Sequence, residues 1–299
     1  MTISAPISHV DRAINDPVLP GGRRPPRWMA SSEDAMLGIG LLSGAANVIM
    51  ELARPGVGYG VKDSRVESGR ADRHPIKRAR TTFTYLAVAL AGSDEQKANY
   101  RRAVNKQHAQ VYSTPDSRVA YNAFEKDLQL WVAACLYKGF VDVYRIFVGE
   151  MDDGWADHHY REGMKLGTTL QVPAEMWPVD RKAFDEYWQQ SLDLVHIDDA
   201  VRDYLYPIAV GRIAGVKLPR WLERRADAVN LFITTGFLPQ RFRDEMRLPW
   251  DASRQRRFNR GMAVLGTVNN LLPRFVRRFP FNAVLIDLDW RIRTGRPLV

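Results

Sequence analysis

Disulfide bonds and the short motifs of several enzyme classes are absent from this 299-residue sequence. Its single cysteine, Cys135, cannot form a disulfide within the chain, and its place in a hydrophobic helical segment indicates an inert core thiol in a reducing compartment. The sequence contains no HExxH or ExxH pair, no GxSxG, no phosphate-binding P-loop and no CxxCH. Zincin, di-iron carboxylate, serine hydrolase, nucleotidase and covalently attached haem chemistry are therefore unsupported.

Long hydrophobic runs are also missing. The uncharged run 35–50 has only 16 residues, three of them glycine, and is too short for a membrane-spanning helix. We expect it to form a buried helix that ends in the segment 51–60, ELARPGVGYG, because proline and glycine break a helix and allow close backbone approach. A phosphate-binding loop is not predicted here, because the GxGxxG spacing and a preceding strand are both missing.

The composition suits one large globular domain, with 45% hydrophobic and 26% charged residues. Helical periodicity prevails along the chain, and strand-like alternation is confined to 282–292, NAVLIDLDWRI. We therefore predict an all-α fold, with one helical domain over 31–299 and an extended or flexible arm over 1–30. Asp180 and Asp198 are predicted helix N-caps.

Positive charge is concentrated near the end of the sequence. Residues 241–299 hold thirteen arginines, no lysine and five acids, so they carry +8 of the net charge of +9. A solvated arginine-rich face is one interpretation, and peripheral membrane contact or binding of haem propionates are alternatives. No nucleic-acid-binding motif is present, and no nucleic-acid partner is predicted.

An export signal is not predicted. Arg23 and Arg24 resemble a twin-arginine pair, but Pro25, Pro26 and two acids separate them from the apolar run. We expect a cytoplasmic protein that is able to associate with a membrane surface.

Two helical segments place polar groups on inward faces. From Pro75 at a helix start, Arg78, Thr82 and Tyr85 recur at i, i+4 and i+7 and share one face. In the next segment, His108 recurs with Tyr100, Val104 and Val111 on an apolar stripe. An inward histidine is either a satisfied core residue or a ligand of a metal or haem, and the pattern leaves both open.

The third segment, 124–140, has Phe124, Leu128, Trp131 and Cys135 at helical spacing and predicts a core helix. A later cluster, DDGWADHHY, brings His158 and His159 together. Adjacent helical residues point about 100 degrees apart, so one ion cannot easily bind both, and a surface helix start is the favoured interpretation.

Four sequence blocks together resemble the latex-clearing protein and MpaB-type oxygenase family: 44–64, 78–92, His108-Ala-Gln-Val and 127–136. That family consists of all-helical haem b proteins, and the resemblance implies a globin-like helical core with additional helices. It implies that His108 is the axial iron ligand and that Arg78 and Thr82 line the opposite, distal side of the haem. Thr81 stands where rubber-cleaving members carry a distal lysine. Asp63 is the nearest counterpart of a distal acid.

The resemblance implies a haem b-dependent oxygenase that uses dioxygen on an apolar or isoprenoid substrate, with oxidative cleavage of a carbon-carbon double bond as the family reaction. Arg78 is expected to stabilise negative charge on dioxygen, Thr82 to donate or relay a proton, and the glycines of 56–60 to let backbone approach the haem ring. Thr81, and Ala133 where MpaB-type members often carry histidine, depart from the family. A haem-dependent hydroxylase or dehydrogenase, or a non-catalytic haem- or lipid-binding protein, therefore remain alternatives.

Overall fold

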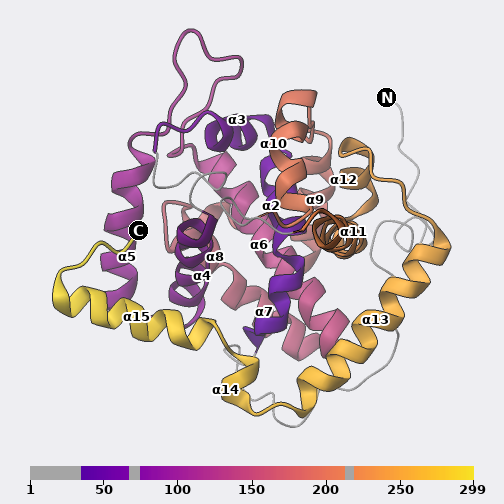
Figure 1. The fold of residues 1–299 in the computed structure, drawn as a ribbon. Helices are drawn as coiled ribbons and strands as arrows, with labels where there is room; N and C mark the ends of the chain where they lie inside the picture. Colours follow the sequence, from indigo (N-terminus) through magenta and orange to yellow (C-terminus); the bar gives the residue numbers. More distant parts are fainter. Residues whose placement is uncertain (1–34, 67–74, 213–218) are drawn as a thin grey trace.

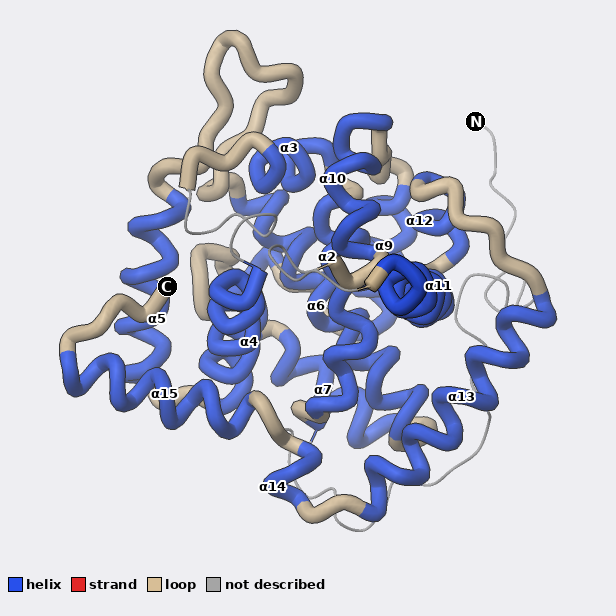
Figure 2. The backbone as a smooth tube through the Cα atoms, viewed as in Figure 1, coloured by secondary structure: helices blue, strands red, loops and turns tan. Residues whose placement is uncertain are grey.

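The computed structural model describes residues 35–66, 75–212 and 219–299, and every regular element in these ranges is a helix (Figures 1 and 2). A single isolated antiparallel bridge joins Tyr112 and Asn122 in the loop after α5. The all-α prediction is thus confirmed. The predicted arm and the Arg23-Arg24 pair lie outside the described residues, so the proposed domain boundary stays a prediction.

The helices have the following bounds in chain order: η2 (Gly38–Ser43), α2 (Gly44–Leu52), α3 (Pro55–Lys62), α4 (Pro75–Ala91), α5 (Asp94–His108), α6 (Lys126–Phe147), α7 (Asp153–Gly163), α8 (Lys165–Thr168), η4 (Ala174–Met176), α9 (Arg181–Leu192), α10 (Asp199–Ala209), α11 (Arg220–Phe237), α12 (Gln240–Glu245), α13 (Ala252–Leu271), α14 (Arg274–Arg277) and α15 (Phe281–Thr294). None of the helices in the described ranges has the length and hydrophobicity needed to cross a membrane.

Helices α2 and α6 form the centre of the core. The Asn47 side chain of α2 donates to the Cys135 carbonyl of α6 at 2.7 Å. The indole of Trp131, which is fully buried, donates to the Glu51 carbonyl at 3.1 Å. The same indole stacks on Trp188 of α9, with ring centroids 5.2 Å apart. These contacts hold the C-terminal end of α2, and therefore Glu51, at a defined place in the core.

Helices α4, α5 and α15 form a second packed group. Figure 1 shows α15 lying across α4 and α5. Tyr100 of α5 donates its hydroxyl to the Thr81 carbonyl at 2.6 Å, and Gln96 donates to Asp289 of α15 at 2.7 Å. The prediction of a strand at 282–292 is wrong, because this segment lies within α15. Phe281, Val284 and Leu288 are its buried residues, and their i, i+3, i+7 spacing is helical, although apolar neighbours obscured it.

The glycine-rich segment was predicted to end a helix, and only part of that prediction is correct. Helix α2 ends at Leu52, but a new helix, α3, begins at Pro55 and continues through Gly60. Proline suits this position because the first helical residue needs no N–H donor. A Cβ on Gly58 would lie 2.5 Å from the Leu52 carbonyl oxygen, so glycine permits the close packing of α3 on α2.

The predicted helix starts are correct at the two positions where an aspartate side chain caps the helix. Asp180 accepts a hydrogen bond from the Ala183 N–H at 2.7 Å, and Asp198 accepts one from Val201 at 2.9 Å, so both predicted N-caps are confirmed. Helix α6 instead begins at Lys126. Phe124 therefore lies before this core helix, with 38% of its surface exposed.

Candidate functional site

Two cavities lie next to each other in the helical body. The first has a volume of about 240 Å³ and is lined mainly by residues of α2, α3, α4, α5, α6 and α8. The second has a volume of about 370 Å³ and is lined mainly from η2, α2, α4, α6 and α10. Glu51, Leu52, Val61 and Arg78 line both cavities and form a shared wall between them.

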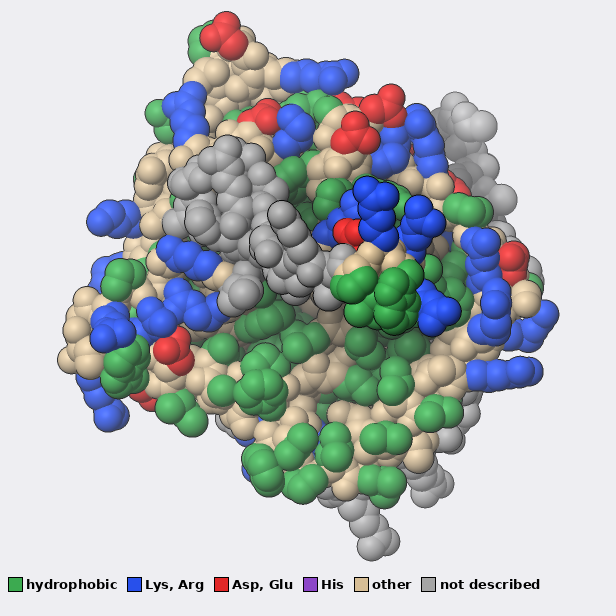
Figure 3. All heavy atoms as spheres, in the orientation of Figure 1, with side chains coloured by type: hydrophobic (Ala, Val, Ile, Leu, Met, Phe, Trp, Pro, Cys, Tyr) green, Lys and Arg blue, Asp and Glu red, His purple; other side chains and the backbone are tan. Residues whose placement is uncertain are grey.

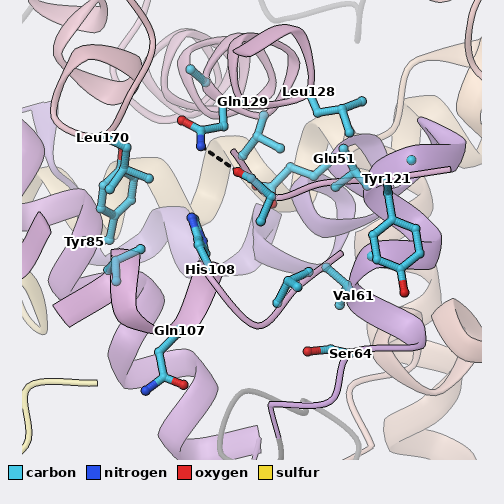
Figure 4. A pocket seen from close by; sticks show the side chains of 18 of the residues that line it. Glu51, Val61, Ser64, Tyr85, Gln107, His108, Tyr121, Leu128, Gln129 and Leu170 are labelled. Atoms are coloured by element: carbon cyan, nitrogen blue, oxygen red, sulfur yellow. Dashed lines mark hydrogen bonds between the residues drawn. The ribbon is translucent and has the colours of Figure 1, made fainter. Parts of the chain in front are cut away.

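His108 is the last residue of α5 and lines the first cavity. Figure 4 shows its ring projecting toward the middle of this cavity, between Tyr85 and Glu51, while Gln107 points the other way. Its Nδ1 atom is buried and has no hydrogen-bond partner among the described residues. Burial, with a smaller contribution from the positive charge of Arg78, lowers the pKa of His108 to about 4, so the ring is neutral at neutral pH.

Several hydrogen bonds hold the end of α5 in place. Gln171 donates from its side chain to Asn105, one turn before His108, and accepts a hydrogen bond from the Gln129 amide at 2.8 Å. Gln129 also donates to the Ala123 carbonyl at 2.6 Å, the bond drawn in Figure 4. These amides connect α5, α6 and the segment after α8. The position of the last turn of α5, which ends at His108, therefore depends on three separate parts of the chain.

Glu51 faces both cavities from the last turn of α2. Burial raises the pKa of its carboxyl to about 7, against the opposing influence of Arg78, and no side-chain hydrogen bond joins it to another described residue. A carboxyl with such a pKa can either donate or accept a proton near neutral pH. Sequence reasoning missed this residue. The available signal was that Glu51 is the sole acid between Ala35 and Lys62, in an otherwise apolar helix.

The predicted shared face of α4 is divided between the cavities. Arg78 lines both, Thr82 lines the second, and Thr81 and Tyr85 line the first. The Thr81 hydroxyl donates to the Lys77 carbonyl at 3.0 Å, and the Tyr85 hydroxyl donates to the Leu166 carbonyl. Neither hydroxyl is therefore an unengaged donor. Arg78 makes no ion pair within 4 Å in the described part of the chain, but its charge influences both Glu51 and His108.

Asp63 lies apart from these groups. Its side chain is exposed, pairs with Lys62 at 2.9 Å and is not among the residues that line either cavity. Ala133, by contrast, is buried and forms part of the wall of the first cavity.

His158 and His159, the adjacent histidines of α7, do not line either cavity. His159 of α7 is buried, and burial lowers its pKa to about 4, as for His108. A helix, α7, does start at this cluster as predicted, with Asp152 as its N-cap, but the predicted surface position is wrong for His159, which is buried. Within the described ranges, no group of three or more His, Cys, Asp or Glu side chains could hold a metal ion by itself.

The arrangement combines a neutral imidazole, a carboxyl that titrates near neutral pH and a guanidinium around a mostly apolar space. The chain matches, over residues 34–267, the family described as "ER-bound oxygenase mpaB/B'/Rubber oxygenase, catalytic domain". Because this match covers most of the chain, the protein belongs to that family of oxygenase catalytic domains, and the suspected resemblance is confirmed.

Two mycobacterial proteins are similar to the chain along their whole length. They are "Uncharacterized protein Rv2237" of Mycobacterium tuberculosis and "Uncharacterized protein Mb2261" of Mycobacterium bovis. Each is 50% identical over 259 residues, which is 87% of this chain and 100% of the relative. No solved structure matches the chain.

Proposed function

We propose that the protein is a haem b-dependent oxygenase that oxidises an apolar, prenyl-type substrate with dioxygen. Membership of the oxygenase family provides the reaction class. The observation that carries the cofactor assignment is His108, a neutral imidazole in a cavity, without a hydrogen-bond partner for its buried Nδ1. A buried polar group without a partner costs about 1–3 kcal/mol, a cost that a functional ligand site commonly retains.

The donor chemistry of His108 fits a haem group. A neutral ring nitrogen of His108 is the donor that haem iron takes from histidine. Gly56 and Gly60 line the same cavity, but a Cβ on Gly56 would lie 2.9 Å from the Leu128 side chain and one on Gly60 would lie 3.4 Å from the Tyr121 ring. These two glycines therefore make room for neighbouring side chains, and the expected approach of a ring to their backbone is not part of the proposal. Haem bound here would supply the activation of dioxygen, which no side chain of the protein can perform alone.

The polar residues of the shared wall would assist that chemistry. Arg78 is an exposed residue that lines both cavities, and its positive charge would stabilise negative charge that develops during oxidation. Glu51 would hold or release a proton at its carboxyl, because its pKa of about 7 leaves both forms populated at neutral pH. Thr82, whose predicted role was proton transfer, would act from the second cavity.

The second cavity suits the apolar substrate. Hydrophobic side chains make up most of its wall, and two of its polar groups are already engaged: Ser43 donates to the Gly40 carbonyl and Asn47 to the Cys135 carbonyl. A hydrocarbon chain loses little on passing Ser43 and Asn47, because both side chains already have hydrogen-bond partners. Its reacting end would meet Glu51 and Arg78 at the shared wall. An apolar substrate of this kind fits the sequence-based expectation of membrane contact through residues 241–299.

The test is the absorption spectrum and iron content of protein purified from haem-supplemented cells, followed by oxygen uptake with geranylgeraniol. We expect a Soret band at one haem per chain and substrate-dependent oxygen consumption. Haem without oxygen consumption would favour a non-catalytic haem-binding protein. A colourless, folded, iron-free protein would overturn the cofactor assignment and leave His108 as a core histidine.

A further inference from the structure

The outer face of α13 is apolar although it is not covered by any described element. Val264, Val268 and Leu271 recur at i, i+4 and i+7, and 64%, 52% and 82% of their surfaces are exposed. The opposite face of α13 packs on α6 and α11. A surface helix normally carries polar residues on its outer face, so this apolar outer face indicates an interaction surface.

The apolar surface continues beyond α13. Phe275 of α14 is 69% exposed, and Phe279 after it is 62% exposed. We name the five side chains together the α13–α14 surface: Val264, Val268, Leu271, Phe275 and Phe279. Figure 3 shows hydrophobic side chains gathered on the part of this face that extends toward α14.

The connection between α13 and α15 is held by buried polar contacts. Arg277 is buried and donates to the Leu272 carbonyl at 2.8 Å, and Asn270 donates to the Phe147 carbonyl of α6 at 3.1 Å. Asn282 donates to the Phe275 carbonyl at 3.0 Å. The backbone that carries the exposed aromatic residues is therefore tied to the core. Binding of a partner would need little ordering of this segment.

The charge around this surface has one sign. Between Ala252 and Ile286 the chain has seven arginines, of which Arg277 is buried, and no acidic residue, and 261–273 has no charged residue at all. Arginines thus flank an uncharged, apolar centre on both sides. Amphipathic segments with this pattern bind the interface of anionic membranes, where arginine meets phosphate and apolar side chains enter the acyl boundary.

We propose that the α13–α14 surface docks on an anionic phospholipid bilayer. A second copy of the chain is disfavoured as the occupant, because a two-fold interface would place the same arginine-flanked surface against itself and bring like charges together. The docking does not depend on the proposed haem chemistry. If that chemistry also holds, docking would bring lipid-dissolved substrate near the second cavity, because Phe281, just after this surface, lines it.

The test uses the whole protein and vesicles of equimolar phosphatidylcholine and phosphatidylglycerol, with phosphatidylcholine vesicles as the comparison. We expect co-flotation with the anionic vesicles, weakened at least about tenfold in the double variant L271E/F275E. The matched control is Val179→Glu, since Val179 is 89% exposed in the loop before α9. Failure of the unmodified protein to bind, or equal binding of the double variant, would overturn the proposal.

A second measurement does not rely on loss of binding. The single native cysteine, Cys135, is buried, and burial raises the pKa of its thiol, so an introduced surface cysteine can be labelled selectively. An environment-sensitive fluorophore on F275C should brighten on anionic vesicles, whereas the same label on V179C should not. Equal responses, or a concentration-dependent dimer in place of vesicle binding, would contradict membrane docking. Haem content and turnover play no part in either readout.

Discussion

The two cavities share a wall but differ in chemistry. The first contains His108, whose pKa is lowered to about 4, and Tyr85, whose hydroxyl is engaged with a backbone carbonyl. The second is lined mostly by hydrophobic side chains. Glu51 and Arg78 face both. In the proposed function, this difference would separate cofactor binding from substrate binding in space, and proton transfer would take place at the wall between the two cavities.

The largest expected effect concerns the first cavity. His108→Ala should abolish stoichiometric haem binding, because it removes the residue proposed to hold the haem iron. His159→Ala is the matched control, since His159 is equally shifted in pKa but lines neither cavity. The Soret absorbance and iron content of both purified variants measure the effect. Loss of haem in both variants, or in neither, would contradict the proposal that His108 in the first cavity holds the haem.

The shared wall should matter most for turnover. Glu51→Gln keeps the shape of the side chain but cannot exchange a proton, so kcat should fall about 100-fold with haem content unchanged. The change of kcat with pH that is expected near pH 7 should be absent in this variant. Asp63→Asn is the comparison, because Asp63 was the acid predicted from the sequence but lies outside both cavities. Full activity of Glu51→Gln with loss in Asp63→Asn would reverse the assignment.

Glu51 also predicts a pH dependence of stability. Its pKa is raised from 4.5 to about 7 in the folded protein, so the unfolded state releases its proton first as the pH rises. The free energy of unfolding should therefore decrease between about pH 5 and about pH 7 and level off above, by at most about 3 kcal/mol for this group. Urea unfolding of Glu51→Gln should show a smaller decrease. If the free energy of unfolding depended on pH in the same way in the unmodified protein and in Glu51→Gln, folding would not raise the pKa of Glu51.

The second cavity can be filled selectively. A Cβ on Gly44, which lines this cavity, meets no atom within 4 Å, so Gly44→Leu should extend into the open space. The affinity for geranylgeraniol, measured by its displacement of bound 1-N-phenylnaphthylamine, should fall about tenfold, while haem content stays the same. Gly261→Leu, at an equally open but exposed position on α13, is the control. Unchanged binding in Gly44→Leu would place the apolar ligand elsewhere.

The smallest effect should distinguish adjacent residues of α4. Thr82→Val, at the second cavity, should change KM for the apolar substrate a few-fold. Thr81→Val, at the first, should change haem affinity a few-fold and leave KM alone, since removal of one hydroxyl typically costs about 1 kcal/mol. Haem titration and steady-state kinetics measure the two effects. If both variants changed KM and haem affinity in the same way, the separate assignment of haem and substrate to the two cavities would be contradicted.

Much of the fold follows from local patterns in the sequence. Helical periodicity predicted an all-α chain and the inward orientation of His108, and aspartate side chains marked the starts of α9 and α10. Local patterns failed where packing decided the result. Residues 282–292 are apolar enough to suit a strand, but contact with α4 selects a helix. The segment 55–60 continues as a helix because its glycines let α3 pack closely on α2.

By itself the sequence determined the helical character of the chain, the family it belongs to and the position of His108 on an apolar stripe. These properties depend on neighbours within two or three turns or on matching motifs. Only the tertiary structure decided that Glu51, 57 residues before His108 in the chain, faces the same cavity, and that Arg78 lies on the wall between two cavities. The physical reason is that cavities, and the pKa shifts that burial causes, arise from contacts between distant segments, which no local pattern records.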